Sequence, residues 1–299
     1  MTKQKAWIEA IRPRTLPLSL AGILFGSAIA FKSGAIDWVI FSLSISTTLL
    51  FQILSNLAND YGDGVKGTDN HERVGPTRAV QSGMITHQQM KSAVILTAVL
   101  SFLSAAVLIY FGTQAMAAPV LWTYAGLAVL CVLAAITYTV GKKAYGYHGL
   151  GDLMVFIFFG LVSVLGVYSL YTKTFDWNNL YPAATIGLLS VAVLNLNNMR
   201  DYASDKKAGK NTLVVKMGID YAKLYHTVIV LLALAFLVLF LLKQTDVIAF
   251  ISLLPGISLF LHLMKVAKIR TTKEFDPELK VVALSTFAIA VLYFASIWF

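Results

Sequence analysis

The sequence predicts an all-α, polytopic membrane protein that forms a single domain over residues 1–299. Hydrophobic residues make up 58% of the chain and charged residues only 13%, whereas a soluble domain carries about a quarter charged residues. Long apolar runs recur along the whole chain, and no polar stretch between them is long enough to fold separately. We therefore expect the chain to lie in a lipid bilayer.

Nine apolar runs are long enough to cross a bilayer, because a spanning helix needs about 20 residues. The expected spans cover residues 16–36, 38–58, 91–112, 119–140, 150–171, 180–199, 222–242, 245–265 and 281–299. The basic N-terminal segment lacks a small-residue cleavage site followed by a soluble domain, so the first run is expected to stay as a helix.

The charged residues predict the orientation. With nine spans, Lys32, Lys173 and Lys243 lie on one side of the membrane, and the rest of the 24 Lys and Arg residues lie on the other. Basic loops face the cytosol, which predicts a multi-pass protein of the plasma (inner) membrane with a cytosolic N-terminus and its chemistry at the cytosolic face. Because these loops are short, the net charge of +9 does not indicate a nucleic-acid partner, and no protein partner is implied.

Metal chemistry based on cysteine or histidine is not expected. Cys131 is the single cysteine, which excludes an intrachain disulfide and a cysteine cluster. The five histidines show no zinc-ligand spacing on one helix.

Two polar clusters follow the second and sixth expected spans. Asn59 and Asp63 are four residues apart, as are Asp201 and Asp205, so each pair lies on one face of a helix. The flanking sequences, Asn-Leu-Ala-Asn-Asp-Tyr from residue 56 and Asn-Leu-Asn-Asn-Met-Arg-Asp-Tyr from residue 195, form a faint internal repeat. In a pseudo-symmetric bundle the two clusters would converge on one cavity.

The chemistry expected of facing carboxylate pairs is magnesium–diphosphate binding. Mg²⁺ takes oxygen ligands, typically one or two carboxylates together with substrate phosphates. Four nearby basic residues are expected to bind phosphate oxygens: Lys66, Arg78, Lys206 and Lys210. The alternative is that the carboxylates are merely solvated at helix ends, where burial costs little; the repetition of the pattern argues against it.

These clusters resemble the two aspartate motifs of the UbiA superfamily of membrane prenyltransferases, which read Asn-Asp-x-x-Asp-x-x-x-Asp and Asp-x-x-x-Asp in loops after the second and sixth helices. Asn59-Asp60-x-x-Asp63 fits the first motif, but Gly67 stands at its last position and Asp69 comes two residues later. Asp201-x-x-x-Asp205 fits the second motif without change.

Further segments are similar to the menaquinone-pathway branch of that superfamily. They are Arg12-Pro-Arg-Thr-Leu-Pro17, residues 135–141, residues 145–152 and Gly209-Lys-Asn-Thr-Leu213. The resemblance implies a ring of nine helices around a central cavity that opens sideways to lipid. It also implies a Mg²⁺-dependent reaction in which a polyprenyl diphosphate alkylates 1,4-dihydroxy-2-naphthoate, releasing diphosphate and carbon dioxide to give demethylmenaquinol.

The resemblance also suggests roles for individual residues. Asn59, Asp63, Asp201 and Asp205 would hold the metal and diphosphate, with Asp60 and Asp69 as weaker candidates. Tyr138 would face the allylic cation, with Tyr145 and Tyr147 next, although aromatic residues also serve as interfacial anchors. Asn56 and Arg200 are expected to contact substrate.

Two interpretations stay open for three other polar residues. Asp152 either caps the fifth span or orients a hydroxyl of the acceptor, with capping the simpler of the two. Arg12 and Arg14 either meet the carboxylate of the acceptor or act as positive-inside anchors.

Other functions fit parts of the pattern. The aspartate motifs do not separate dihydroxynaphthoate from acceptors such as 4-hydroxybenzoate or a haem or chlorophyll precursor. Enzymes that transfer phosphatidyl groups also use Asp-x-x-x-Asp, but within one continuous motif. A cation-coupled transporter needs ionisable groups near the middle of its spans, and the predicted spans show none there.

Overall fold

The computed structural model describes residues 2–68, 74–75 and 78–299. All regular secondary structure in this part of the chain is helical, and nine helical segments within it are long and apolar enough to cross a membrane. The predicted all-α class and the predicted number of spans are therefore confirmed.

The helices in the first half of the chain are α1 (Lys3–Ile11), η1 (Pro13–Thr15), α2 (Leu16–Lys32), α3 (Trp38–Lys66), α4 (His87–Gly112), α5 (Ala118–Thr137) and η2 (Tyr145–His148). Those in the second half are α6 (Gly151–Val155), η3 (Phe156–Gly166), α7 (Val167–Thr172), η4 (Trp177–Asn179), α8 (Leu180–Arg200), α9 (Tyr202–Lys207), α10 (Leu213–Met217), α11 (Ile219–Leu241), η5 (Val247–Leu253), α12 (Pro255–Lys268), η6 (Thr272–Glu274) and α13 (Phe275–Ser296).

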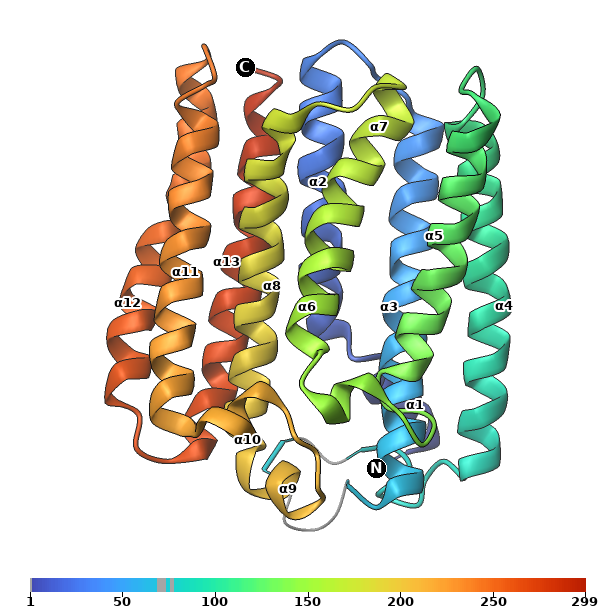
Figure 1. Cartoon of the computed structure of the whole chain (residues 1–299), viewed down its shortest axis with the longest axis vertical. Coiled ribbons are helices and arrows are strands. Elements are labelled where there is room, and N and C mark those ends of the chain that lie inside the picture. The colour runs from blue at the N-terminus through green and yellow to red at the C-terminus, as the bar shows by residue number, and fades with distance from the viewer. Residues whose placement is uncertain (1, 69–73, 76–77) are drawn as a thin grey trace.

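The long helices stand side by side as a bundle (Figure 1). Helix α2 packs against α3 and α13, α3 packs against α4 and α5, and α8 packs against α11, α13 and η3. The N-terminus lies at the same end of the bundle as α9 and α10, and the C-terminus lies at the opposite end, as an odd number of spans requires (Figure 1). Both aspartate segments lie at the end of the bundle that holds the N-terminus.

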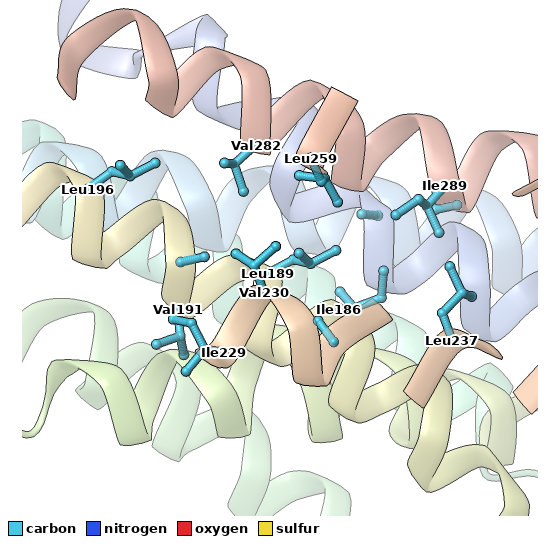
Figure 2. Packing of buried hydrophobic residues seen from close by; sticks show 14 of the residues in the cluster. Ile186, Leu189, Val191, Leu196, Ile229, Val230, Leu237, Leu259, Val282 and Ile289 are labelled. Carbon is cyan, nitrogen blue, oxygen red and sulfur yellow. The ribbon is translucent and has the colours of Figure 1, made fainter. Parts of the chain in front are cut away.

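The largest apolar core joins α8, α11, α12 and α13 (Figure 2). Leu189 of α8, Val230 of α11 and Val282 of α13 are fully buried there. Helices α11, α12 and α13 also share one polar network: His226 and His262 lie 2.8 Å apart through their Nε2 atoms, and Nδ1 of His262 lies 2.6 Å from Oε2 of Glu278. The second half of the bundle thus packs along α8, at whose end the second aspartate motif begins.

Glycines allow η3 to pack directly on its neighbours. A Cβ atom at Gly160 of η3 would lie 2.6 Å from the carbonyl oxygen of Ala183 and 2.7 Å from Cα of Gly187, both on α8. A Cβ atom at Gly26 of α2 would lie 2.6 Å from the carbonyl oxygen of Val164. Such backbone contact is how membrane helices associate closely, and here it fixes η3 between α2 and α8.

Several helix ends differ from those expected. The second span continues to Lys66 and ends at Gly67, whose φ is 69°, so the first aspartate motif forms the last turns of α3, as its four-residue spacing predicted, and lies beyond the expected end of the span at residue 58. The apolar run underestimates this helix because its final polar residues face the interior of the bundle. The fifth span also contains an 11-residue π-helix, Phe156–Gly166, which the apolar pattern does not signal because it has the same composition as an α-helix.

We predict that Gly160→Ala destabilises the protein, because the added methyl group meets α8 backbone atoms that cannot move independently. Overpacking of this kind costs about 1–3 kcal/mol. Gly126→Ala is the matched control, because nothing lies within 4 Å of a Cβ atom at Gly126 in α5. Thermal unfolding in detergent should show a lower Tm for Gly160→Ala only; equal Tm values would contradict the close contact of η3 and α8.

Candidate active site

A cavity of about 370 Å³ runs along the inside of the bundle. Thr47 and Asp63 of α3 both line it, which corresponds to about 24 Å of helix. Its deep part is mainly apolar and includes Phe51, Phe158 and Leu170. Polar side chains gather at its mouth, and both aspartate motifs contribute to them: Asn59, Asp63, Asn197, Asp201, Asp205 and Lys210. The predicted convergence of the two motifs on one cavity is confirmed.

Lys210 joins the two motifs. Its Nζ lies 3.7 Å from Oδ2 of Asp63 and 3.9 Å from Oδ1 of Asp205. The backbone turns at Gly209, whose φ is 70°, and the N–H of Lys210 then donates to the carbonyl of Asp205 at 2.8 Å. Burial lowers the pKa of Lys210, but the attraction of Asp63 and Asp205 exceeds this effect and raises the pKa above its ordinary value. Lys210 is therefore a permanent cation between two carboxylates.

Tyr147 orients Asp63. Its hydroxyl donates to Oδ1 of Asp63 at 2.7 Å and lies 2.6 Å from Oγ1 of Thr68; since the tyrosine proton goes to Asp63, the threonine donates to the tyrosine. Burial and the nearby Asp63 charge both raise the pKa of Tyr147, so the hydroxyl keeps its proton. The ammonium of Lys66 lies 3.8 Å from the centre of the Tyr147 ring.

Arg200 orients Asp201. Its Nε and Nη2 donate to the two oxygens of Asp201 at 2.9 and 2.7 Å. Its Nη1 donates to Asp276 of α13 and its Nη2 also donates to Asn197, both at 2.7 Å. The Arg200 side chain is only 2% exposed. These contacts hold the Asp201 side chain in place. The sequence predicted instead that Arg200 contacts substrate.

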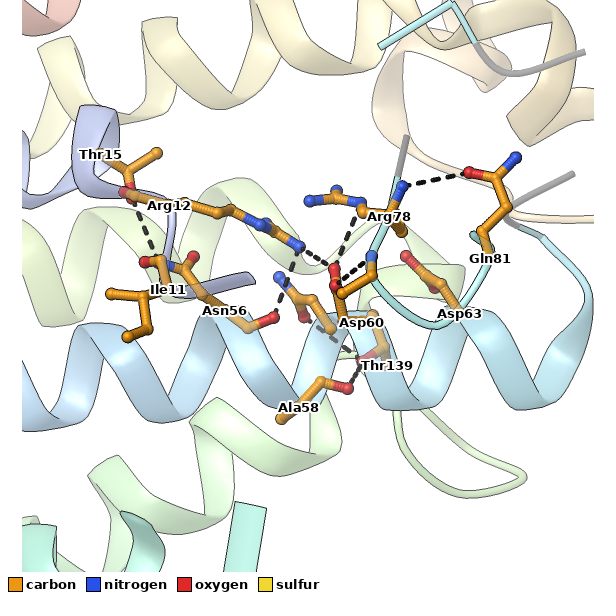
Figure 3. Close-up of polar contacts among 12 residues, drawn as sticks. Ile11, Arg12, Thr15, Asn56, Ala58, Asp60, Asp63, Arg78, Gln81 and Thr139 are labelled. Atoms are coloured by element: carbon orange, nitrogen blue, oxygen red, sulfur yellow. Dashed lines mark hydrogen bonds and ion pairs between the residues drawn. The ribbon is translucent and has the colours of Figure 1, made fainter. Parts of the chain in front are cut away.

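Asp60 belongs to a different network at the edge of the cavity (Figure 3). Its Oδ1 lies 3.0 Å from Nη2 of Arg12 and 3.4 Å from Nε of Arg78. Its Oδ2 accepts from the backbone N–H of Ala79 at 3.3 Å. Asp60 is 1% exposed and is not among the residues that line the cavity. It connects the N-terminal segment to residues beyond α3, while Asn59 and Asp63 face the cavity.

Asn56 also holds the N-terminal segment in place. Its Nδ2 donates to the carbonyl of Ile11 at 2.7 Å and to Oγ1 of Thr15 at 3.2 Å. It nevertheless lines the cavity, as do Arg12 and Arg78.

Tyr138 and Tyr145 form an aromatic pair on the cavity wall. Their ring centres are 5.3 Å apart in an edge-on arrangement, and both residues line the cavity. A Cβ atom at Gly146 would lie 2.6 Å from the carbonyl oxygen and 2.9 Å from the ring of Tyr138, so a glycine is required for residue 146 to pack this closely on Tyr138. Burial raises the pKa of Tyr138 to about 12, which keeps its ring a neutral phenol.

The remaining predicted residues lie elsewhere. Lys66 and Lys206 are exposed and do not line the cavity, and Asp69 falls outside the described residues. Asp152 is not a helix cap: α6 is capped by Leu150 without a side-chain bond, and Asp152 accepts a hydrogen bond of 3.0 Å from Tyr225. The capping expectation was wrong because α6 begins at Gly151, so Asp152 lies within the first turn of the helix and not at the cap position.

The residues at the mouth fit a divalent metal. They offer hard oxygen donors from two sides, and Lys210 shows that a cation is stable between Asp63 and Asp205. Within the described ranges, no three His, Cys, Asp or Glu side chains form a ready-made metal cluster.

Comparison with known proteins identifies the family. Residues 19–284 match the UbiA prenyltransferase family. The chain belongs to the UbiA prenyltransferase family. It is 46% identical to the 1,4-dihydroxy-2-naphthoate octaprenyltransferase of Escherichia coli K12 over 80% of this chain and 77% of that protein. The Mycobacterium tuberculosis protein of the same name is 39% identical over 71% and 70% of the two chains.

A solved structure has the same fold as this prenyltransferase. The UbiA homologue of Aeropyrum pernix K1 superposes with a TM-score of 0.67 at 16% identity, covering 95% of this chain and 96% of that one. The predicted resemblance is thus confirmed, and divalent-metal dependence is general in this family.

Two contributors to the prenyltransferase site were not predicted. Asn197 stands one helical turn before Asp201 as Asn59 stands before Asp63, so the internal repeat contained a signal for it. Asp276 is 76 residues from Arg200 in sequence, and no motif or spacing points to it.

We predict that Lys210→Met lowers the free energy of unfolding by about 3 kcal/mol, because breaking a buried ion pair leaves uncompensated charge. Mg²⁺ should then raise the Tm of the variant more than that of the wild type, because a divalent ion can replace the missing cation. The exposed Lys268→Met is the control. Thermal unfolding in chelator and in Mg²⁺ measures both effects; wild-type behaviour of Lys210→Met would contradict the pairing.

Proposed function

We propose that this prenyltransferase transfers a polyprenyl group from a polyprenyl diphosphate to 1,4-dihydroxy-2-naphthoate. The observation that carries the proposal is the meeting of Asp63 and Asp205 at Lys210, at the polar mouth of a deep apolar cavity. The polar mouth suits a diphosphate, and the apolar part of the cavity suits a hydrocarbon chain. The acceptor is inferred from the relatives named for that substrate at 46% and 39% identity.

The reaction forms one carbon–carbon bond and breaks two bonds. The C1–O bond of the prenyl diphosphate breaks and diphosphate leaves with the electron pair. The ring carbon that carries the carboxylate bonds to C1, and the carboxylate departs from that same carbon as carbon dioxide, leaving its bonding electrons to the ring. The product is demethylmenaquinol.

We propose Mg²⁺ as the metal, held by Asn59, Asp63, Asp201 and Asp205. When bound, it supplies Lewis-acid neutralisation of the departing diphosphate. Tyr147 and Arg200 orient Asp63 and Asp201 through the hydrogen bonds described above, so the carboxylates are preorganised, which is the main source of electrostatic catalysis.

Other residues of this chain act on the organic parts of the substrates. Lys210 adds a fixed positive charge beside the leaving group. Tyr138 presents an aromatic ring on the cavity wall, where its face stabilises positive charge on the allylic carbon. Phe158 and Phe159 line the cavity and exclude water that would otherwise capture the cation.

We predict that Asp63→Asn and Asp201→Asn each lower kcat by about 100-fold or more, the effect of losing one preorganised electrostatic contact. Asp220→Asn, at an exposed site in α11, should match the wild type. The assay uses purified protein, dihydroxynaphthoate, labelled prenyl diphosphate and Mg²⁺, with chelator in parallel. Near-normal turnover of Asp63→Asn at limiting Mg²⁺ would refute the site, and prenylation of 4-hydroxybenzoate but not dihydroxynaphthoate would refute the acceptor.

We further propose that the protein lies in the plasma membrane with its N-terminus and active site in the cytosol. Lys32, Lys173 and Lys243 are at the end of the bundle away from the aspartate motifs, and most basic residues are at the other end, as the positive-inside rule requires. In a Cys131→Ser background, a membrane-impermeant thiol reagent should label Lys243→Cys but not Lys5→Cys in intact cells. The reverse pattern would invert the orientation.

A further inference from the structure

Gln52 places an amide group in the wall of the cavity, well below its polar mouth. The residue is half-buried on α3 and lines the cavity. It precedes Asp63 by about three helical turns, which correspond to about 16 Å along the helix. The side chain is neutral, so neither its position nor its charge suits the diphosphate. An amide at this depth needs hydrogen-bond partners, because an unpaired polar group in apolar surroundings is costly.

Hydrogen bonds from the N-terminal segment fix which end of this amide faces the cavity (Figure 3). Nδ2 of Asn56 donates to the carbonyl of Ile11 at 2.7 Å and to Oγ1 of Thr15 at 3.2 Å. Oδ1 of Asn56 is therefore free to accept, and Nε2 of Gln52 donates to it at 3.1 Å. Because a backbone carbonyl accepts and never donates, Ile11 sets the orientation of the Asn56 amide and, through it, that of the Gln52 amide.

This orientation leaves Oε1 of Gln52 as an acceptor without a donor. Among the described residues no hydrogen bond reaches this oxygen, and it is not one of the unpaired atoms that the protein encloses. Oε1 is therefore open to the cavity. An acceptor held in place in this way favours a ligand with a hydrogen-bond donor, because any other occupant would leave the oxygen unpaired and dry. The hydrocarbon chain of a prenyl donor has no such group.

The wall of α5 beside Gln52 consists of small side chains. Helices α3 and α5 run in the same direction, and the hydroxyl of Thr139 donates to the carbonyl of Ala58 at 3.0 Å, so residues 128–135 lie beside residues 47–54. The cavity-lining residues of this part of α5 are Ala128, Cys131, Ala134 and Ala135. Small side chains opposite a polar amide suit a flat aromatic ring that carries a hydroxyl group.

We propose that Gln52 accepts a hydrogen bond from the 4-hydroxyl of the aromatic acceptor and thereby selects acceptors that carry this group. The inference rests on the proposed function, because it takes 1,4-dihydroxy-2-naphthoate as the acceptor. In that reaction the prenyl group bonds to the carbon that carries the carboxylate, beside the 1-hydroxyl, so this edge of the ring faces the diphosphate. The 4-hydroxyl is farther from the reacting carbon and reaches deeper. It is also meta to that carbon, so the contact serves binding and not activation of the ring.

The test removes the amide from the protein and each hydroxyl from the ligand. Wild type, Gln52→Met and the exposed control Gln114→Met are titrated without oxygen in the presence of Mg²⁺ and a prenyl thiodiphosphate, which replaces the reactive donor. The ligands are 1,4-dihydroxy-2-naphthoate, 1-hydroxy-2-naphthoate and 4-hydroxy-2-naphthoate, and binding is followed by ligand fluorescence.

Wild type should bind the dihydroxy compound about 10-fold more tightly than 1-hydroxy-2-naphthoate, the effect of leaving one buried acceptor unpaired. Gln52→Met should weaken both ligands that carry the 4-hydroxyl about 10-fold and leave 1-hydroxy-2-naphthoate unchanged. Gln114→Met should match the wild type with all three ligands.

Three results would overturn the proposal. The first is equal wild-type affinity for the dihydroxy compound and 1-hydroxy-2-naphthoate, a comparison that does not depend on the folding of a variant. The second is equal weakening of all three ligands by Gln52→Met, which would show a purely structural role through Asn56. The third is weakening of only the two ligands with a 1-hydroxyl, which would place the other edge of the ring at Gln52. Failure of the proposed function is a separate result, seen as absence of prenyl transfer from prenyl diphosphate to dihydroxynaphthoate by the wild type.

Discussion

Carboxylates at the mouth of an apolar cavity need cations, and this requirement organises the site. Asp63, Asp201 and Asp205 come from two distant segments and are each at most 5% exposed, where unpaired charge is costly. Lys210 and Arg200 supply part of the compensation. The carboxylate oxygens that face the cavity suit a divalent ion and the diphosphate that accompanies it. The carboxylates of the protein and the diphosphate of the proposed substrate are both anions, so one cation can compensate the charge of both.

The same principle separates the acidic residues by role. Asp60 and Asp63 are three residues apart on α3, yet Asp60 joins two arginines at the edge of the bundle and Asp63 faces the cavity. Their difference in contacts explains how one short motif both holds the N-terminal segment and presents a carboxylate to the cavity. The apolar core and the His226–His262–Glu278 network hold together the helices beside α8, from whose end the second motif extends.

The sequence predicted the membrane class, the number of spans and the pairing of the two motifs, because apolar length and four-residue spacing are local properties. It did not predict contacts between residues remote in the chain, such as Arg200 with Asp276 or Arg12 with Asp60, since nothing in either segment identifies the partner. The spacing of Asn59 and Asp63 predicted helix through the first motif, but the apolar run placed the end of the span at residue 58, because residues that face an interior cavity are as polar as those of a loop. The π-helix was not predicted because its i→i+5 hydrogen bonds do not require a different amino-acid composition from that of an α-helix.

The central claim is that both motifs share one metal–diphosphate unit. The most direct measurement is an experimental structure of the protein with Mn²⁺ and a prenyl thiodiphosphate, in which anomalous scattering locates the metal. We predict metal within coordination distance of Asp63 and of at least one of Asp201 and Asp205, with the diphosphate between them and the prenyl chain in the apolar cavity. Metal and diphosphate bound by only one motif, with the other motif unchanged, would contradict this account.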